Sequence, residues 1–266
     1  MQNEFIKRLI STLILLPIVL GLFYLGSFYF IFLILFIVIY ALYEWDSIIQ
    51  LKISSSLYLL RSIIIIPIIF LTIYYKDNFL FFLFLFIGFL FTFTLSLKAK
   101  NYFFPLIGYI FILTPAIFII MLRLSVNFEF IAIVAFFASV WLSDIGGYFF
   151  GRIFKGPKLI PSISPNKTFS GAIGSILLPI IGLLLSNIFF QFDNLIFMYL
   201  LIICISILAQ LGDLSESLFK RKFGVKNSGK ILPGHGGILD RIDSFVYTIP
   251  FFSIIFYSFD MENLWY

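Results

Sequence analysis

Residues 9–43 contain no charged side chain over a run of 35 residues. One membrane-spanning helix needs about 20 apolar residues, so this run is long enough for two, and Gly26-Ser27 offers a turn in its middle. The two spans would be joined without any polar loop. A chain that begins in this way is constrained to fold in a bilayer.

The composition of the whole chain agrees with that constraint. Of the 266 residues, 62% are hydrophobic and only 12% are charged, whereas soluble proteins have about 45–50% apolar and about 25% charged residues. The single cysteine leaves no intrachain disulfide. A soluble nucleotide-binding domain, a disordered linker and a secreted disulfide scaffold are therefore excluded. We expect an all-α, polytopic membrane helical bundle.

Nine apolar segments have the length of a membrane span. They lie at about residues 10–25, 28–43, 57–75, 79–97, 103–122, 130–150, 171–190, 195–212 and 242–259. Lys7-Arg8 before the first segment resembles the start of a signal peptide. Because no small-residue cleavage site follows, we expect an uncleaved first span.

The basic residues predict the orientation. With the N-terminus in the cytoplasm, only Lys76 and Arg123 of the 18 Lys and Arg residues fall in outer loops, Arg61 lies within a span, and the other fifteen are cytoplasmic. We expect a multi-pass protein of the plasma (inner) membrane with its active site facing the cytoplasm. The net charge of +5 is then explained by basic residues that set the membrane orientation, so no nucleic-acid partner is expected.

The polar residues are concentrated in the second half of the chain. Ten of the 18 basic residues lie between Arg152 and Arg241. We expect residues 1–140 to be scaffold spans and residues 141–266 to form a membrane catalytic region, with cytoplasmic loops at 151–170 and 213–243.

The first of these loops has the pattern of an anion site. Ser164-Pro165 is typical of a helix start, and a helix N-terminus there would stabilise an anion at the interface. A basic signal that only holds the topology is the alternative interpretation. The candidate substrate-binding residues are Ser162, Ser164, Lys167 and Thr168.

The second loop carries acids at both ends. If the span at 195–212 continues as a helix, one face carries Asp213, Glu216, Ser217 and Lys220. Asp240 and Asp243 are three residues apart on the expected first turn of the last span. Clustered carboxylates at a membrane boundary usually bind a cation, and oxygen ligands suit Mg²⁺.

Other polar residues near the spans are candidates too. His235 stands among glycines that include Gly236 and Gly237, whose bare backbone lets a phosphate approach. Asp144 lies within a predicted span, where acids are functional candidates. Glu44 ends the uncharged run and fits an interfacial position. The Gly147/Gly151 spacing favours close helix packing.

These residues resemble the signature of the phosphatidate cytidylyltransferase (CDP-diacylglycerol synthase) family. The resemblance rests on Ser217-Leu-Phe-Lys220-Arg221, on Lys226-Asn227, and on Pro233-Gly-His235-Gly236-Gly237-Ile-Leu-Asp240-Arg241-Ile-Asp243. The segments 144–151, 164–171 and 212–214 are also similar to the family. Asn227 and Ser170 depart from it, because the family has Asp and usually Glu there.

The resemblance implies transfer of CMP from CTP to phosphatidate, giving CDP-diacylglycerol and pyrophosphate in phospholipid biosynthesis. It implies Mg²⁺, with a second metal ion left open, and a homodimer, as family members are described. The metal ligands would be Asp213, Asp240 and Asp243. The catalytic set adds His235, Lys220 and Arg221, and the substrate-binding set adds Asp144, Ser217, Lys226, Gly236, Gly237 and Arg241 to the residues of the first loop.

Two other classes of function remain open. An anion or metal transporter would spread polar residues across the depth of the membrane, whereas here they gather at one face. A polyprenyl-phosphate or other lipid-phosphate transferase would use similar acids. Within that class, the Asp-x-x-Asp-Gly-x-x-Ala-Arg pattern of CDP-alcohol phosphatidyltransferases is absent, since Asp243 is followed by Ser244-Phe245.

Overall fold

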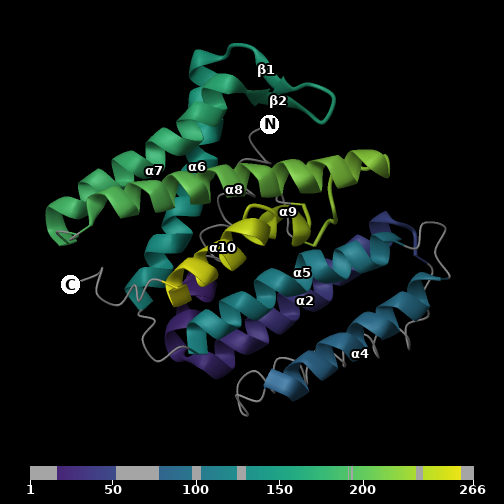
Figure 1. Ribbon diagram of the computed structural model, residues 1–266. Helices are drawn as coiled ribbons and strands as arrows, with labels where there is room; N and C mark the ends of the chain where they lie inside the picture. Colours follow the sequence, from purple (N-terminus) through teal and green to yellow (C-terminus); the bar gives the residue numbers. More distant parts are fainter. Residues whose placement is uncertain are drawn as a thin grey trace. The chain divides into compact units, whose positions relative to one another are not determined.

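The computed structural model describes residues 17–51, 78–97, 103–124, 130–190, 192, 194–231 and 236–258. Residues 17–25 are helical. The elements that follow are α2 (Ser27–Ile48), α4 (Asn78–Ser96), α5 (Phe103–Leu124), α6 (Phe130–Phe154), β1 (Lys158–Ile160), β2 (Ser164–Thr168), α7 (Phe169–Phe190), α8 (Leu195–Lys222), α9 (Leu239–Ile242) and α10 (Phe245–Ser258) (Figure 1).

Most of the predicted spans are helices. In the described part of the chain, α2, α5, α6, α7 and α8 are long and apolar enough to cross a membrane, and α4 and α10 add shorter apolar segments. The protein is thus a multi-pass helical membrane protein. Gly26, with φ of 121°, separates residues 17–25 from α2, where the sequence predicted a turn. The span expected at 57–75 lies outside the described residues.

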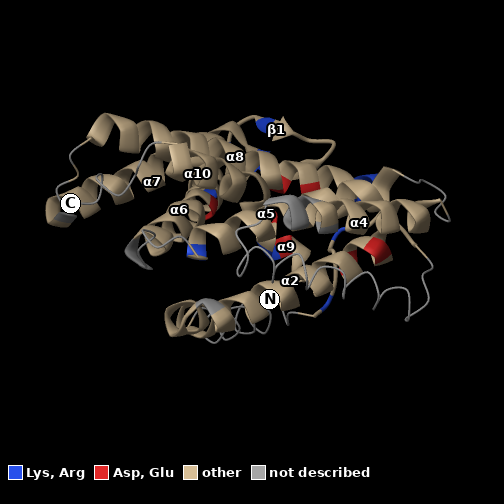
Figure 2. Cartoon of the chain, turned by 60° about the horizontal axis from the view of Figure 1, so that its bottom comes forward, with Lys and Arg blue, Asp and Glu red and all other residues tan. Residues whose placement is uncertain are grey.

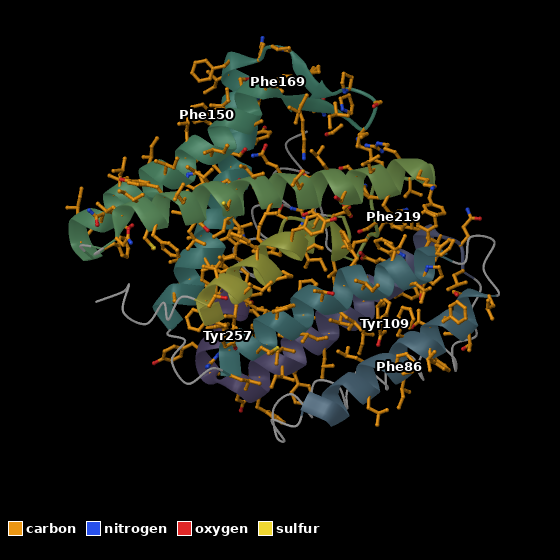
Figure 3. All side chains as sticks on the ribbon, in the orientation of Figure 1. Phe86, Tyr109, Phe150, Phe169, Phe219 and Tyr257 are labelled. Atoms are coloured by element: carbon orange, nitrogen blue, oxygen red, sulfur yellow. The ribbon has the colours of Figure 1, made fainter. Side chains whose placement is uncertain are left out.

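The helices are apolar along most of their length. Lys, Arg, Asp and Glu occupy a small part of the ribbon in Figure 2. Phe86 on α4 and Phe169 on α7 have exposed rings, whereas Tyr109 on α5 and Phe219 on α8 are buried (Figure 3). Large apolar side chains turned outward are what a lipid solvent requires, because a bilayer does not drive them inward.

The chain divides into two compact units. Unit 1 consists of Met1–Ser125 and Phe223–Arg241, and its described helices α2 and α4 both pack on α5. Trp45 on α2 donates its indole N–H to the Phe104 carbonyl at 2.9 Å. A Cβ at Gly108 would lie under 3.0 Å from the Trp45 ring, so glycine lets these two helices approach closely.

Unit 2 consists of Val126–Lys222 and Ile242–Tyr266. Helices α6 and α7 form its main packing, and α8 packs on α6, α7 and α10. The α6–α7 seam is lined by glycines: a Cβ at Gly146 would lie under 3.0 Å from the Gly174 carbonyl, and Gly151 faces Gly171. This agrees with the close packing expected from the Gly147/Gly151 spacing.

The helix start predicted at Ser164-Pro165 is wrong. Residues Ser164–Thr168 form β2, which pairs antiparallel with β1 and aligns Lys158 with Thr168. Helix α7 begins at Phe169, and Thr168 Oγ1 accepts a hydrogen bond from the Gly171 N–H at 3.1 Å, as an N-cap does. Ser164 and Thr168 both have capping side chains, and strand pairing leaves that role to Thr168.

Candidate functional site

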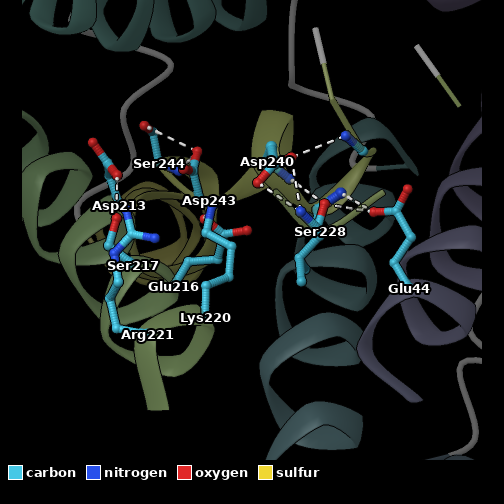
Figure 4. A network of polar contacts seen from close by, with 12 residues as sticks. Glu44, Asp213, Glu216, Ser217, Lys220, Arg221, Ser228, Asp240, Asp243 and Ser244 are labelled. Atoms are coloured by element: carbon cyan, nitrogen blue, oxygen red, sulfur yellow. Dashed lines mark hydrogen bonds and ion pairs between the residues drawn. The ribbon is translucent and has the colours of Figure 1, made fainter. Parts of the chain in front are cut away.

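The C-terminal part of α8 carries the first group of candidate residues, all in unit 2. Lys167 Nζ on β2 lies 2.7 Å from Asp213 Oδ2 on α8. Ser217, one helical turn further, donates its hydroxyl hydrogen to Asp213 Oδ1 at 3.3 Å. The sequence predicted Asp213 and Ser217 on one face of a continued helix, and the structure confirms it (Figure 4).

A buried ion pair lies on the same helix. Glu216 is fully buried and Lys220 is 8% exposed, and their side chains form an ion pair across one turn. A buried charge is costly without a partner, and each of these two side chains supplies a partner for the other. The sequence placed Glu216 and Lys220 on the same face of the helix as Asp213 but did not predict that the two would pair.

Arg221 ties the hairpin to α8. Its Nε donates a hydrogen bond to the Ile163 carbonyl, in the turn between β1 and β2, at 3.2 Å. With the Lys167–Asp213 pair, this gives the hairpin two anchors on the same helix. The loop predicted to bind an anion and the helix predicted to carry the acids are therefore joined within unit 2.

Asp243 and Asp144 are two acids of unit 2 that share a serine partner. Ser244 donates its hydroxyl hydrogen to Asp144 Oδ1 at 3.2 Å, and the Ser244 N–H lies 2.7 Å from Asp243 Oδ1. Burial raises the pKa of the Asp243 carboxyl well above its ordinary value, and the neighbouring acids Asp213, Glu216 and Asp144 raise it further. This carboxylate therefore lies among other acids.

The expected helical turn around Asp240 and Asp243 is not continuous. Asp240 lies in α9, which ends at Ile242, whereas Asp243 lies in a turn before α10. The Asp243 side chain takes the N–H of Ser244, which competes with helical hydrogen bonding. The expectation that both acids begin one helix is therefore wrong.

Asp240 binds backbone and side-chain groups of unit 1. Its carboxylate accepts hydrogen bonds from the N–H groups of Ser228, at 3.0 Å, and Gly237, at 2.9 Å. Gly236 has φ of 88°, a conformation that favours glycine. A Cβ at Gly236 would lie close to the Asp240 carboxylate. The glycines here give the backbone room to fold around this acid.

The other candidate residues lie outside the site contacts described above. Ser162, Lys226 and Arg241 are exposed, and Thr168 is buried, with its hydroxyl engaged as the cap of α7. His235 lies outside the described residues. Among the residues that carry contacts, sequence reasoning missed Ser228 and Ser244. It gave Glu44 an interfacial position and did not predict that this side chain is buried within the protein.

The carboxylate oxygens of these acids are ligands of the type that Mg²⁺ prefers. Within the described residues, no three His, Cys, Asp or Glu side chains group closely enough to hold a metal by themselves. Mg²⁺ usually takes one or two carboxylates and completes its shell with water and substrate phosphates. Asp144 and Asp243, which share the Ser244 hydroxyl, fit that requirement. Asp213 is already paired with Lys167.

Comparison with known proteins identifies relatives of the chain. The Cytidylyltransferase family matches residues 6–259. The phosphatidate cytidylyltransferase of Staphylococcus saprophyticus is 52% identical over 120 residues, which cover 45% of this chain and 46% of that relative. The phosphatidate cytidylyltransferase of Staphylococcus aureus (strain COL) is 49% identical with the same coverage. The chain thus spans about half the length of the relatives it matches.

Proposed function

Because the chain belongs to the Cytidylyltransferase family, which matches residues 6–259, we propose that it is a phosphatidate cytidylyltransferase. In this reaction an oxygen of the phosphate monoester of phosphatidate attacks the α-phosphorus of CTP. The bond between the α-phosphorus and the bridging oxygen breaks, and pyrophosphate leaves with that oxygen. The product, CDP-diacylglycerol, is a precursor of phospholipid head-group synthesis.

The gathering of opposite charges around α8 supports this chemistry most directly. Both reactants are anionic, so an enzyme must neutralise charge and align the two phosphates more than it must supply a nucleophile. Lys167, Lys220 and Arg221 lie on or against the C-terminal part of α8, in one unit with Asp144 and Asp243. We assign the three basic residues to the phosphates of CTP and of the departing pyrophosphate.

The acids are assigned to the cofactor. Asp144 and Asp243 would hold Mg²⁺, which supplies positive charge to the phosphate oxygens when it is bound. Ser244 orients Asp144 through its hydroxyl group. The raised pKa of Asp243 means that this residue must lose its proton to act as a ligand. The sequence-based metal set of Asp213, Asp240 and Asp243, and a second metal ion, stay predictions.

The location follows from the substrates. Phosphatidate resides in a bilayer and CTP is dissolved in the cytoplasm, so the two meet only at the cytoplasmic face of a membrane. We propose the plasma membrane as the site, with the loops at 151–170 and 213–243 facing inward. The homodimer also stays a prediction, for which chemical crosslinking in isolated membranes is the direct test.

The test is product formation by the purified protein in mixed micelles. We expect CTP and phosphatidate to give CDP-diacylglycerol and pyrophosphate in equal amounts, only with Mg²⁺ present. Asp243→Asn protein, purified in parallel, is expected to lose at least about 100-fold in rate, as removal of a charge-stabilising group does. If polyprenyl phosphate were a better acceptor than phosphatidate, the protein would instead be another lipid-phosphate transferase. Ion flux in liposomes without nucleotide turnover would replace it by a transporter.

A further inference from the structure

Glu44 is a buried acid near the end of α2. It is 2% exposed, and the apolar run of residues 9–43 precedes it. Burying a carboxylate costs free energy unless hydrogen bonds replace its water. The partners of Glu44 therefore decide what this residue does.

In the described part of the chain, three donors to this carboxylate come from one distant segment of unit 1. Glu44 Oε2 accepts hydrogen bonds from the Ser228 hydroxyl at 2.8 Å and from the Leu239 N–H at 2.9 Å. Glu44 Oε1 accepts a third from the Ile238 N–H at 3.0 Å. Ser228 is the first residue of segment 228–240, of which the structure describes 228–231 and 236–240, and Ile238 and Leu239 lie near its C-terminal end. Figure 4 shows the Glu44 and Ser228 side chains. One side chain thus binds both ends of that segment.

Two glycines let the backbone come this close. A Cβ at Gly229 would lie under 3.0 Å from the Glu44 carboxylate, and a Cβ at Gly237 would meet both Glu44 and Ser228. Both contacts are with the functional groups themselves, so an added methyl group would displace the hydrogen bonds. Gly237 belongs to the glycine pair that the sequence marked as a phosphate-binding backbone, and the structure adds a second reason for glycine at this position.

Asp240 also joins the two ends of segment 228–240. Its carboxylate accepts the Ser228 N–H, and the Asp240 N–H lies 3.3 Å from the Ser228 hydroxyl oxygen. The Ser228 hydroxyl donates to Glu44 and accepts from Asp240, so it connects the two acids. Glu44 is the member of this network that is contributed by a different helix, and it anchors the segment to α2.

We propose that Glu44 is a positioning residue, which fixes segment 228–240 on α2 so that its glycine backbone and acidic end are held in the geometry used by the enzyme. Its kinetic part rests on the proposed function, because it takes this segment to belong to the substrate site. Its structural part does not. Glu44 itself does not touch substrate in this proposal, and its effect passes through Ser228, Ile238 and Leu239.

The experiment compares wild type, Glu44→Gln, Glu44→Ala and the control Ser47→Ala in detergent micelles. Ser47 is exposed on the same end of α2. Glutamine keeps the size of the side chain but turns an amide N–H₂ toward N–H donors. The first readout is the rate of tryptic cleavage after Lys230, an exposed residue of the segment, followed by mass spectrometry. The second is kcat and KM for CTP, below the melting temperature of every variant.

We expect Glu44→Gln to speed cleavage after Lys230 and to lower kcat/KM by about tenfold or more, since hydrogen bonds to a charged group are lost. Both effects should be larger in Glu44→Ala than in Glu44→Gln, and Ser47→Ala should match wild type in cleavage rate and kinetics. If Glu44 only stabilised the fold, kcat and KM of the folded variants would equal those of wild type. That result, or unchanged cleavage in Glu44→Gln, overturns the proposal.

Two further points keep the test decisive. Should Glu44→Ala fail to fold, Ser228→Ala removes one of the three hydrogen bonds to Glu44, together with the one from the Asp240 N–H. It is expected to show a change of the same kind. If wild type forms no CDP-lipid, the proposed function fails, but the cleavage rates still decide whether Glu44 holds the segment. Faster cleavage with kcat and KM equal to those of wild type would show that Glu44 only holds the segment, and this result also overturns the proposal of a positioning residue.

Discussion

Lys167 on β2 and Asp213 on α8 form an ion pair of 2.7 Å that joins the hairpin to the helix. Their side chains are 25% and 36% exposed, and exposed pairs of this kind contribute at most about 1 kcal/mol to stability. The stability of the fold therefore gives little reason for a lysine here. A role in binding phosphate gives a stronger one, because Lys167 would exchange one anionic partner for another.

The first prediction separates these two roles of Lys167. Lys167→Ala is expected to raise KM for CTP or to lower kcat by about tenfold or more, as loss of a charge-assisted phosphate contact does. Its melting temperature should change by only a few degrees, since the pair is partly exposed. Steady-state kinetics and thermal unfolding in micelles measure the two effects. Lys158→Ala, an exposed lysine of β1, is the matched control, and equal effects of both variants would contradict the assignment.

The second prediction concerns Asp243 and pH. The pKa of this carboxyl is raised in the folded protein by burial and by neighbouring acids. The folded state therefore holds the proton more tightly than the unfolded chain, whose Asp pKa is about 3.9. The resulting stabilisation is complete below that value and is lost as the pH rises through the raised pKa. Wild type in EDTA should lose stability over this range relative to Asp243→Asn.

Thermal unfolding of both proteins between about pH 5 and pH 8.5 in EDTA measures this difference. At the alkaline end we expect Asp243→Asn to be the more stable by at least about 1 kcal/mol, the equivalent of roughly one pKa unit. The comparison with the variant removes the pH dependence of all other groups. A difference that stays constant with pH would show that Asp243 titrates normally.

Element positions were predictable here wherever they depend on local patterns. The spans at 103–122 and 171–190 correspond closely to α5 and α7, because the length of an apolar run decides them. The start of α7 was missed, since Ser164 and Thr168 carry equivalent capping side chains and only pairing with β1 distinguishes them. The choice depends on tertiary structure that a local pattern does not contain.

The contacts of the candidate site also include some that local patterns predicted and some that they did not. Asp213 and Ser217 were placed on one face by helical spacing alone, and their hydrogen bond confirms it. The contact of Glu44 with Ser228 joins residues 184 positions apart, and no local pattern links them. The turn at Asp243 was missed as well, because its cause is the side chain's own bond to Ser244. The Glu44 contact was thus missed because it is long-range, whereas the Asp243 turn was missed because helical spacing does not show that a side chain will bond to the next residue.

The third prediction tests the role of Asp240. Its carboxylate binds the N–H groups of Ser228 and Gly237, so Asp240→Asn turns an amide toward donors and leaves at least one of them without an acceptor. We expect faster tryptic cleavage after Lys230 and a fall in kcat/KM of about tenfold or more. The Mg²⁺ concentration for half-maximal activity is the second measurement. A large rise in that concentration with unchanged cleavage would instead support the sequence-based assignment of Asp240 as a metal ligand.

The fourth prediction uses two adjacent glycines of α6. A Cβ at Gly146 would lie under 3.0 Å from the Gly174 backbone carbonyl of α7, whereas a Cβ at Gly147 would be 3.6 Å from Ser175 Cβ, an ordinary contact. Both changes to alanine favour the helix by about 0.8–1 kcal/mol. Only Gly146→Ala forces α6 and α7 apart, at a cost of about 1–3 kcal/mol for overpacking. We therefore expect Gly146→Ala to melt several degrees below Gly147→Ala in the same detergent, and equal melting temperatures would contradict the close approach of α6 and α7.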